Sequence, residues 1–436
     1  MWTLFLFLYN LICVPLLYIV FYTGSLFNEK MKRGRKGRAR YWENAKEIAA
    51  RIPQDASVFL FHSSSVGEWE QAVPVIEKMK ERDNSIFVIV TFFSPSGYHV
   101  VNNQIIDAKM YLPLDSFCNA KRFFTLFKPK AWIICKYDIW PNMLRAAKRN
   151  KIPVLLTSAE LAEDSKRYTF PMNVVNKIYY KKIDYILAIS EDTRQRFLKI
   201  FPFQDRLFTA GDSRFDRIYQ KVQRILPEPP IRIFKMDDGF KLILGSSWPT
   251  DEKHVLPACV NLMKKHQKLQ LIVVPHEISE AHIQSIEELF TAQGIDVERY
   301  SIFSKQEGTF AKVAIIDTVG ILSKLYKITK LAYVGGSFGS GVHNVMEPAA
   351  FAQPIIFGPK HLNSFEACQL EYLMAAHTIH NQNEFEIIVE HMLNNEELRA
   401  AKGQDALKFL TDHLGSTDKT ISLLEILKLI KPSDPE

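Results

Sequence analysis

The sequence predicts a two-domain α/β protein with a long apolar helix at its N-terminus. Three observations support this prediction. Short, continuously apolar runs alternate with amphipathic stretches in two separate series, which is typical of parallel sheets covered by helices on both faces. A segment with three prolines in four positions lies between the series, at 225–240. Residues 2–28 contain no charged side chain, and a chain of 436 residues has room for two domains behind them.

The N-terminal segment 1–28 is expected to be a membrane-anchor helix. At ~1.5 Å per residue, about 20 residues cross the ~30 Å core of a bilayer, so this segment is long enough. The next eleven residues, Lys30–Arg40, hold seven Lys or Arg and no acid. Basic residues after the apolar stretch, with no small-residue cleavage site, do not fit a cleaved signal peptide. The positive-inside rule places the body in the cytoplasm, while a single-pass and a monotopic helix both remain open.

The positive charge of the chain is local. The formal net charge is +7, and without the run Lys30–Arg40 the remaining chain has 48 basic and 48 acidic residues. A nucleic-acid-binding protein spreads its basic residues over a face, so no nucleic-acid partner is expected. The run instead predicts contact with anionic lipid headgroups. Five scattered cysteines without a C-x-x-C pair are typical of a reduced, cytoplasmic protein without a zinc motif.

The predicted domains are 29–224 and 241–436, with a linker at 225–240 and a helical tail at 396–431 inside the second domain. In the first domain, strands are expected at 57–63, 86–93, 109–114, 131–135, 154–157, 185–190 and 207–210, with helical patterns such as 69–82 and 120–127 between them. In the second, strands are expected at 241–244, 269–274, 313–316, 330–334 and 354–357.

The first polar turn of interest follows the strand at 57–63. In open α/β sheets, ligands bind beyond the carboxyl ends of the strands. The turn Ser63–Glu68 opens a helix and places Glu68 in its first turn, where the helix dipole favours a carboxylate. An N-terminal helix charge is the simpler interpretation of Glu68, and a general base is the functional one.

The second turn is a glycine-rich loop between a strand and a helix. Residues 335–341 contain four glycines, which exceeds what a turn needs, and a helix opens near Asn344. Such loops bind phosphate through backbone N–H groups, and Glu347 one turn into the helix suits ribose hydroxyls. Neither G-x-G-x-x-G nor a Walker A pattern is present. The loop therefore predicts nucleotide binding of another kind.

Weaker signals follow other strands, at Gly245–Trp248 with Asp251 and Glu252, at Pro275–Glu277, and at Gly211–Asp216. Each alone is more often a turn than a site. Together they place polar groups at successive strand ends. His276 and His343 are lone histidines that suit a hydrogen bond to phosphate, and no metal or other cofactor is expected.

With these residues in view, the sequence resembles the 3-deoxy-D-manno-octulosonic acid (Kdo) transferases, membrane-anchored glycosyltransferases of lipid A and lipopolysaccharide biosynthesis. The resemblance covers nearly the whole chain. Its segments are SSVGE at 64–68, IWPN at 139–142, GDSRFD at 211–216, GSSWPTDE at 245–252, and YVGGSFGSGVHNVMEPAAFAQPIIFGP at 333–359 with Asn363 and Phe365 after it. The long C-terminal segment is the most specific.

The resemblance implies a GT-B fold of two Rossmann-like domains facing a cleft, with acceptor binding in the first and CMP-sugar binding in the second. It implies transfer of Kdo from CMP-Kdo to a lipid A precursor at the inner membrane, with inversion and without a required metal. Glu68 would be the base that deprotonates the acceptor hydroxyl. Ser337, Asn344 and Glu347 would hold CMP, with Glu347 on the ribose. The full set of implied substrate-binding residues is Ser65, Gly67, Asp138, Ser246, Ser247, His276, Gly335, Gly336, Ser337, His343, Asn344, Glu347 and Asn363.

The sequence departs from the family pattern at four positions. A family glutamate is Lys136 here, and an arginine is Glu160. His276 replaces an arginine, which weakens a phosphate contact unless Lys360 substitutes, and Ile321 replaces another glutamate. The base and the glycine-rich loop are intact, so we expect a divergent, active branch.

The sequence leaves two alternatives to a Kdo transferase open. The protein could be another membrane-associated GT-B enzyme that uses a UDP-sugar. A non-catalytic membrane tether would bind a nucleotide sugar without turnover.

Overall fold

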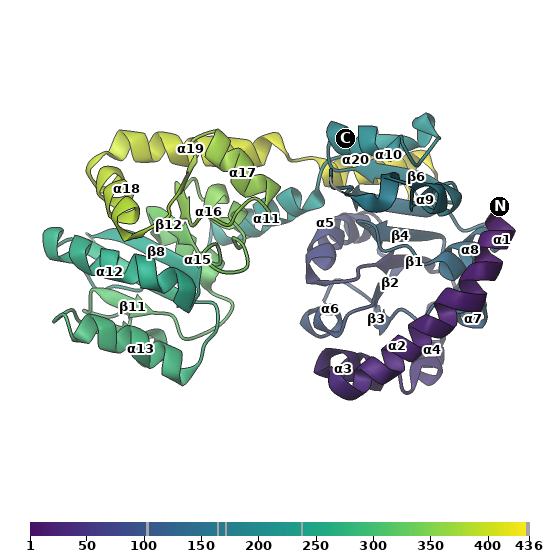
Figure 1. Ribbon diagram of the computed structural model, residues 1–436, viewed down its shortest axis with the longest axis horizontal. Coiled ribbons are helices and arrows are strands. Elements are labelled where there is room, and N and C mark those ends of the chain that lie inside the picture. Colours follow the sequence, from purple (N-terminus) through teal and green to yellow (C-terminus); the bar gives the residue numbers. More distant parts are fainter. Residues whose placement is uncertain (102–103, 164, 171, 237–238, 433–436) are drawn as a thin grey trace. The chain divides into compact units, whose positions relative to one another are not determined.

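The computed structural model describes residues 1–436 except 102–103, 164, 171, 237–238 and 433–436. The chain forms two compact units (Figure 1). Unit 1 consists of Met1–Arg217 and His413–Glu436, and unit 2 consists of Ile218–Asp412.

Unit 1 is built on a parallel seven-stranded sheet in the order β3-β2-β1-β4-β5-β6-β7. The order reverses at β1, whose neighbours are β2 and β4, so the carboxyl ends of β1 and β4 form the switch point at which such sheets bind ligands. The strands are β1 (Ser57–His62), β2 (Ile86–Phe92), β3 (Ala108–Tyr111), β4 (Ala131–Cys135), β5 (Val154–Ala159), β6 (Tyr185–Ala188) and β7 (Leu207–Thr209).

Helices cover both faces of this sheet because alternate side chains of each strand enter opposite cores. In β1, Phe59 and Phe61 pack against α5 (Val66–Arg82) and α20 (Ser416–Ile426). Val58 and Leu60 enter the other core, which contains α4 (Tyr41–Ala50), α7 (Phe117–Phe127), α8 (Pro141–Arg149), α9 (Met172–Tyr180) and α10 (Glu191–Phe197). The short helix α6 (Pro95–Val100) follows β2.

The apolar N-terminus is one continuous helix made of α1 (Trp2–Leu8), the π-helical turn η1 (Tyr9–Cys13) and α2 (Val14–Phe27). It is the one helix among the described residues that is long and apolar enough to cross a membrane. The π turn precedes Pro15, whose missing N–H leaves a gap in the α-helical ladder. Figure 1 shows the helix lying along unit 1, and the basic helix α3 (Glu29–Gly37) follows it.

Unit 2 repeats the architecture with a parallel sheet in the order β10-β11-β9-β8-β12-β13-β14. Its switch point lies at β8, between β9 and β12. The strands are β8 (Phe240–Ser247), β9 (Leu269–Pro275), β10 (Val297–Arg299), β11 (Val313–Ile315), β12 (Leu331–Val334), β13 (Ile355–Phe357) and β14 (Ala376–Thr378).

One face of this sheet packs against α12 (Pro249–Lys265), α13 (Glu280–Thr291) and α18 (Gln382–Asn394). The other face packs against shorter elements, including α14 (Tyr300–Phe303), α15 (Leu322–Leu325) and the 3₁₀ turn η4 (Tyr326–Ile328). The remaining helices are α16 (Met346–Ala350), α17 (Phe365–Tyr372) and α19 (Glu396–Asp412). Edge strands β10 and β14 were not predicted, because each has three residues and no continuous apolar run.

The units differ from the predicted domains at the segment 225–240. The chain passes from unit 1 to unit 2 within α11 (Ser213–Ile225), before this segment. Ile233 and Phe234 of the segment are buried in the core of unit 2, so its prolines do not mark a free linker. Residues 237–238 of the predicted linker lie outside the described residues.

The tail also differs from the prediction of one helical extension of the second domain. It breaks at Gly415, which has a φ of +97°, and α20 belongs to unit 1. Asp216 fixes this arrangement, since its carboxylate accepts hydrogen bonds from the amides of Gly415 at 2.7 Å and Thr417 at 2.6 Å. The turn Gly211–Asp216 therefore holds the start of α20 against unit 1.

Candidate functional site

The proposed base Glu68 lies at the carboxyl end of β1, in the first turn of α5. It forms a capping box with Ser65: the Ser65 amide donates to Glu68 Oε2 at 2.6 Å, and the Ser65 hydroxyl donates to the same oxygen at 3.2 Å. No described residue donates to Oε1. The side chain is 6% exposed. Glu68 is thus a helix cap as the simpler interpretation expected, and one of its oxygens remains available for chemistry.

Gly67, which precedes Glu68, has open space where a side chain would lie. It is exposed, and a Cβ placed on it has no heavy atom within 4 Å. Its φ is not in the left-handed region. Neither sterics nor backbone conformation within the described residues therefore requires glycine here, although glycine in a helix costs ~0.5–1 kcal/mol relative to alanine.

A prediction follows for Gly67→Ala. The added methyl group is expected to raise the unfolding free energy by up to ~1 kcal/mol, because alanine favours the helix. If an acceptor packs on this face, the same methyl group is expected to raise the acceptor KM. Thermal unfolding and steady-state kinetics check the two effects. An unchanged KM in a variant of equal or higher Tm would mean that no acceptor approaches Gly67.

Asp138 is the second polar group at the carboxyl ends of the strands in unit 1, and it follows β4. It pairs with His62, a histidine that was not among the predicted site residues. His62 Nε2 lies 2.9 Å from Asp138 Oδ2, and His62 Nδ1 lies 2.9 Å from Thr91 Oγ1. Burial acts to raise the pKa of Asp138, but several hydrogen bonds, that of His62 first among them, together with the charge of His62 outweigh it and lower the pKa. Asp138 is therefore an oriented, ionised carboxylate at the switch point. His62 was missed because it ends an apolar strand and belongs to no motif.

In unit 2, the glycine-rich loop lies directly beside the turn that follows β8. A Cβ on Gly335 would lie 2.2 Å from the carbonyl oxygen of Ser246, and Gly336 and Gly341 have φ of +97° and +135°. Ser246 has a φ of +54°, which is strained for a residue with a side chain. These glycines thus allow two backbone turns to meet at the switch point.

Asp251 of α12 holds the two turns together. Its buried carboxylate accepts hydrogen bonds from the amides of Trp248 at 3.0 Å, Gly336 at 2.8 Å and Phe338 at 3.2 Å, and from the Tyr333 hydroxyl at 3.0 Å. One carboxylate therefore fixes the start of α12 and the shape of the glycine-rich loop.

Trp248, His276 and His343 form an aromatic cluster above this loop. The His276 ring stacks on Trp248 at 4.5 Å and on His343 at 4.4 Å between ring centroids. Trp248 Nε1 donates to His343 Nε2 at 2.7 Å, which leaves the ring proton of His343 on Nδ1. Burial lowers the pKa of His343, as does the neighbouring His276. His343 is thus a neutral donor, and His276 is exposed.

Some of the other residues predicted to bind the donor are buried and others are exposed. Ser247 and Ser337 are fully buried and bonded internally, to Glu252 at 2.7 Å and to the Gly358 amide at 2.5 Å. Asn344 and Asn363 are exposed. Glu347 binds Lys221 at 2.8 Å and the Ser323 hydroxyl at 2.6 Å.

Lys360, which the sequence analysis considered as a substitute cation, lies beside the same loop. Its ammonium group donates to the carbonyl oxygen of Gly339 at 3.0 Å. Within the described residues, no group of three His, Cys, Asp or Glu side chains is placed to hold a metal ion.

Comparison with known proteins establishes the family. Residues 33–217 match the family model described as 3-deoxy-D-manno-octulosonic-acid transferase. The 3-deoxy-D-manno-octulosonic acid transferase of Aquifex aeolicus is 31% identical over 302 residues, which cover 68% of this chain and 75% of the relative. The chain belongs to the Kdo transferase family. The Haemophilus influenzae Kdo transferase is 24% identical over 430 residues, 98% of each chain, so the similarity includes the N-terminal helix.

The fold of this Kdo transferase agrees with the sequence-based expectation. A crystal structure of UDP-GlcNAc 2-epimerase from Neisseria meningitidis matches with a TM-score of 0.57 and 13% identity, covering 85% of this chain and 100% of that one. Together with the two parallel sheets, this likeness confirms the GT-B fold. The chain is accordingly a glycosyltransferase.

Two of the departures of this Kdo transferase from the family pattern meet in space. Lys136 Nζ lies 3.0 Å from Glu160 Oε2, at the carboxyl ends of β4 and β5. The family resemblance implies a glutamate and an arginine at these positions, so both charges are reversed here, and the two side chains form an ion pair. The two changes lie 24 positions apart along the chain, so no local pattern links them.

We expect this pair to behave as one unit. Lys136→Glu alone places two carboxylates together and is expected to cost about 1 kcal/mol of stability, since the pair is only partly buried. The double variant Lys136→Glu with Glu160→Lys is expected to recover most of the stability and turnover. A double-mutant cycle measures the coupling; additive effects would show that the two residues act independently.

Proposed function

We propose that this Kdo transferase moves Kdo from CMP-Kdo to a lipid A precursor with inversion, and that Glu68 is the base. Glu68 Oε1 takes the proton of the acceptor hydroxyl while that oxygen forms a bond to the anomeric carbon of Kdo. The bond from that carbon to the phosphate oxygen breaks, and CMP leaves with the electron pair. One carboxylate suffices because no covalent intermediate forms.

The observation that carries this proposal is Oε1 of Glu68, to which no described residue donates a hydrogen bond, at the carboxyl end of β1. The second carboxylate of the edge, Asp138, is bonded to His62 and is assigned to acceptor binding, together with Ser65 and Gly67.

For the donor, we propose that the glycine-rich loop and its neighbours in unit 2 bind CMP-Kdo. Donors surround the loop: Nδ1 of the half-buried His343, and the exposed His276 ring, Asn344 and Lys360 ammonium. Lys360 is the cation that compensates for the histidine at position 276, because it lies next to the Gly339 carbonyl. Ser337, Ser247 and Asp251 support the backbone that presents these groups, and Glu347 contacts the ribose.

We further propose that the protein is a monotopic protein of the inner membrane, with its body in the cytoplasm. The polar side chains of the N-terminal helix support this orientation. Tyr9 donates to Asp115 at 2.9 Å, Asn10 exchanges two hydrogen bonds with Asn142 at 2.9 Å, and Asn119 donates to Tyr18 at 3.0 Å. The helix is thus fastened to unit 1 from residue 9 to residue 18.

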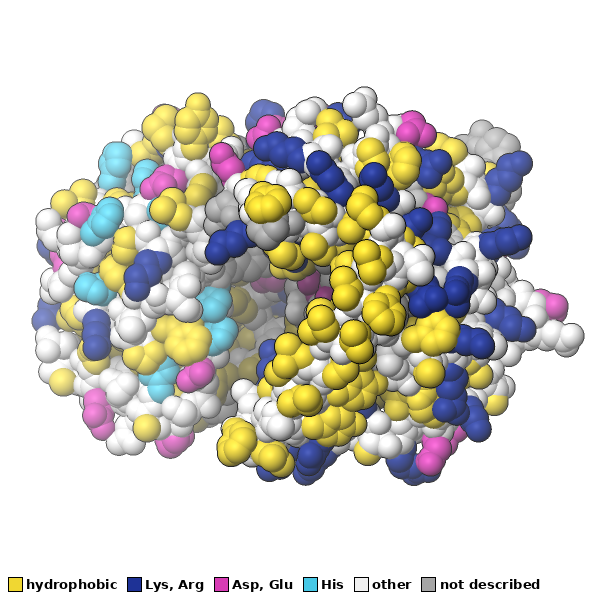
Figure 2. Space-filling view, turned by 45° about the vertical axis from the view of Figure 1, so that its right-hand side comes forward, with side chains coloured by type: hydrophobic (Ala, Val, Ile, Leu, Met, Phe, Trp, Pro, Cys, Tyr) yellow, Lys and Arg dark blue, Asp and Glu magenta, His cyan; other side chains and the backbone are white. Residues whose placement is uncertain are grey.

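The outer face of this helix is apolar along its length. Figure 2 shows hydrophobic side chains gathered in a band over it, with Lys and Arg beside the band. A helix fastened along the domain can lie in the interface with this face among the acyl chains. The exposed apolar residues of the helix are Leu4, Phe7, Leu8, Leu11, Ile12, Leu16, Ile19, Val20, Leu26 and Phe27.

Spin labels at Leu4, Leu11 and Leu26 test the orientation. In a background without the exposed Cys13 and Cys118, an in-plane helix is expected to place all three labels at similar depth below the headgroups. A spanning helix would bury the middle label deepest and leave the two end labels near opposite surfaces. Depth-dependent paramagnetic quenching distinguishes these profiles.

Mass spectrometry of a lipid A precursor incubated with purified protein and CMP-Kdo tests the reaction itself. The expected product is heavier by one or more Kdo residues. Transfer from a UDP-sugar instead of CMP-Kdo would overturn the donor assignment. Binding of CMP-Kdo without any product would overturn the catalytic proposal.

A further inference from the structure

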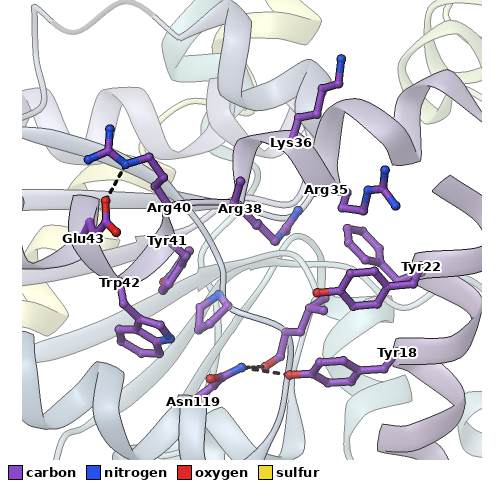
Figure 3. Close-up of a pocket in the computed structure, with 14 residues that line it drawn as sticks. Tyr18, Tyr22, Arg35, Lys36, Arg38, Arg40, Tyr41, Trp42, Glu43 and Asn119 are labelled. Atoms are coloured by element: carbon purple, nitrogen blue, oxygen red, sulfur yellow. Dashed lines mark hydrogen bonds and ion pairs between the residues drawn. The ribbon is translucent and has the colours of Figure 1, made fainter. Parts of the chain in front are cut away.

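A cavity of about 600 Å³ lies in unit 1 between the N-terminal helix and the turn from α3 to α4 (Figure 3). Aromatic residues of α2 form one wall, and Tyr41 and Trp42 form the opposite one. Pro113, Leu114 and Asn119 also line it, as do the charged side chains of Lys36, Arg40 and Glu43. The basic run was expected to contact anionic lipid headgroups, and a cavity within it was not expected.

The cavity carries positive charge that nearby acids do not neutralise. Arg35 lines it, and among the described residues Arg35 has no acidic partner. The two acids that flank the basic run are already paired, Glu29 with Lys32 at 2.8 Å and Glu43 with Arg40 at 2.5 Å. The remaining charge is therefore available to an anion.

Arg38 supplies a second, rigid guanidinium group to the same cavity. It donates to the carbonyl oxygens of Leu112, Gly34 and Phe93 at 3.1 Å each, which uses three of its five N–H groups. Burial lowers the pKa of Arg38 to about 10, so it stays protonated at neutral pH. Phe93 and Leu112 directly follow β2 and β3. Arg38 therefore holds the cavity at the carboxyl ends of the strands, where Glu68 also lies.

Hydroxyl groups complete the donor set. Figure 3 shows Tyr18 and Tyr22 directing their hydroxyls into the cavity from α2. The Tyr18 oxygen accepts a hydrogen bond from Asn119 at 3.0 Å, which leaves its own proton free to donate. The Tyr41 hydroxyl is buried without a hydrogen-bond partner among the described residues.

The cavity also lies next to the apolar band. Tyr22 lines it and is 49% exposed, and Ile19 and Val20 are exposed on the adjoining surface of the same helix. A ligand with an anionic head in the cavity can therefore lay an acyl chain along the helix. Guanidinium groups with several hydroxyl donors suit a phosphate group, which offers several acceptor oxygens.

We propose that this cavity binds the phosphate of a membrane lipid headgroup, with Arg35, Arg38, Tyr18 and Tyr22 as donors. This inference deepens the proposed membrane association, because it replaces a diffuse charge attraction by one defined lipid site. The phosphate can belong to a bulk anionic phospholipid or to the lipid acceptor.

Vesicle co-sedimentation of the full chain tests the site without donor or turnover. Phosphatidylcholine vesicles carry either phosphatidylglycerol or, at equal surface charge, oleate, which has no phosphate. Arg35→Ala and Tyr22→Phe are expected to weaken binding to the phosphatidylglycerol vesicles selectively, with a loss of about 10-fold for Arg35→Ala. Arg33→Ala is the matched control, since Arg33 lies in the same helix, is exposed and does not line the cavity.

Equal losses for Arg33→Ala and Arg35→Ala, or equal losses on oleate and phosphatidylglycerol vesicles, would overturn the proposal in favour of diffuse electrostatics. The acceptor KM, measured in phosphatidylglycerol-rich micelles, separates the two lipid sources. A raised KM for Arg35→Ala under these conditions assigns the site to the acceptor phosphate, and an unchanged KM with weakened vesicle binding assigns it to bulk lipid. Failure of Kdo transfer itself would leave the vesicle result intact, so the two proposals fail independently.

Discussion

Glu68→Gln is expected to reduce Kdo transfer by at least ~10²-fold, the range usually lost with a general base. Glutamine keeps a carbonyl oxygen that can accept the hydrogen bond of the Ser65 amide, so the helix cap survives. The base, however, is gone. CMP-Kdo binding is expected to persist, because the proposed donor site lies in unit 2. Initial rates, calorimetric titration with CMP-Kdo and thermal unfolding measure the three properties separately.

Glu70→Gln is the matched control for this variant. Glu70 is two residues along the same helix, is half-buried and pairs with Arg217 at 3.1 Å. Its replacement is expected to leave transfer nearly unchanged. Near-normal turnover by a correctly folded Glu68→Gln protein would reject Glu68 as the base and leave it as a helix cap.

Asp251→Asn is expected to have the largest effect on stability. The carboxylate accepts four hydrogen bonds, and an amide offers one acceptor oxygen and turns a donor nitrogen toward the others. Each buried donor that loses its acceptor costs ~1–3 kcal/mol, and about two do so here. The melting temperature of unit 2 is therefore expected to fall by roughly 5–20 °C.

The same change is expected to weaken CMP-Kdo binding, because the amides of Gly336 and Phe338 lose the group that fixes the glycine-rich loop. Differential scanning calorimetry and donor titration measure both effects. Asp296→Asn is the control, since Asp296 is exposed in the same unit and its replacement should change stability by less than ~0.5 kcal/mol. Equal stability of the two variants would contradict the role assigned to Asp251.

Much of the fold could be predicted from short stretches of sequence, because burial of a strand and backbone conformation each require particular residues at neighbouring positions. Buried parallel strands read as apolar runs, and both central sheets were predicted except for two three-residue edge strands. The glycine-rich loop stood out because its conformation and close approaches need glycine. The predicted linker at 225–240 is not a free linker. Its prolines do not prevent Ile233 and Phe234 from packing in the core of unit 2.

The candidate site was only partly predictable for a related reason. Glu68 and the residues around Gly335 lie in continuous motifs. His62 and the reversed pair of Lys136 with Glu160 belong to no motif, because their partners come from other strands. Ser247 and Ser337 fit a ligand-binding pattern, yet their hydroxyls serve the protein's own backbone and side chains.

The sequence by itself determined the class of the protein: two parallel α/β sheets, an apolar N-terminal helix followed by a basic run, and the motifs of a Kdo transferase. These properties depend on composition and short spacings, which are written along the chain. Only the tertiary structure decided that Tyr9, Asn10 and Tyr18 fasten the helix to unit 1, that α20 returns to unit 1, and that part of the basic run lines a cavity. Each depends on hydrogen bonds or packing between distant segments, and such contacts leave no periodic signal in the sequence.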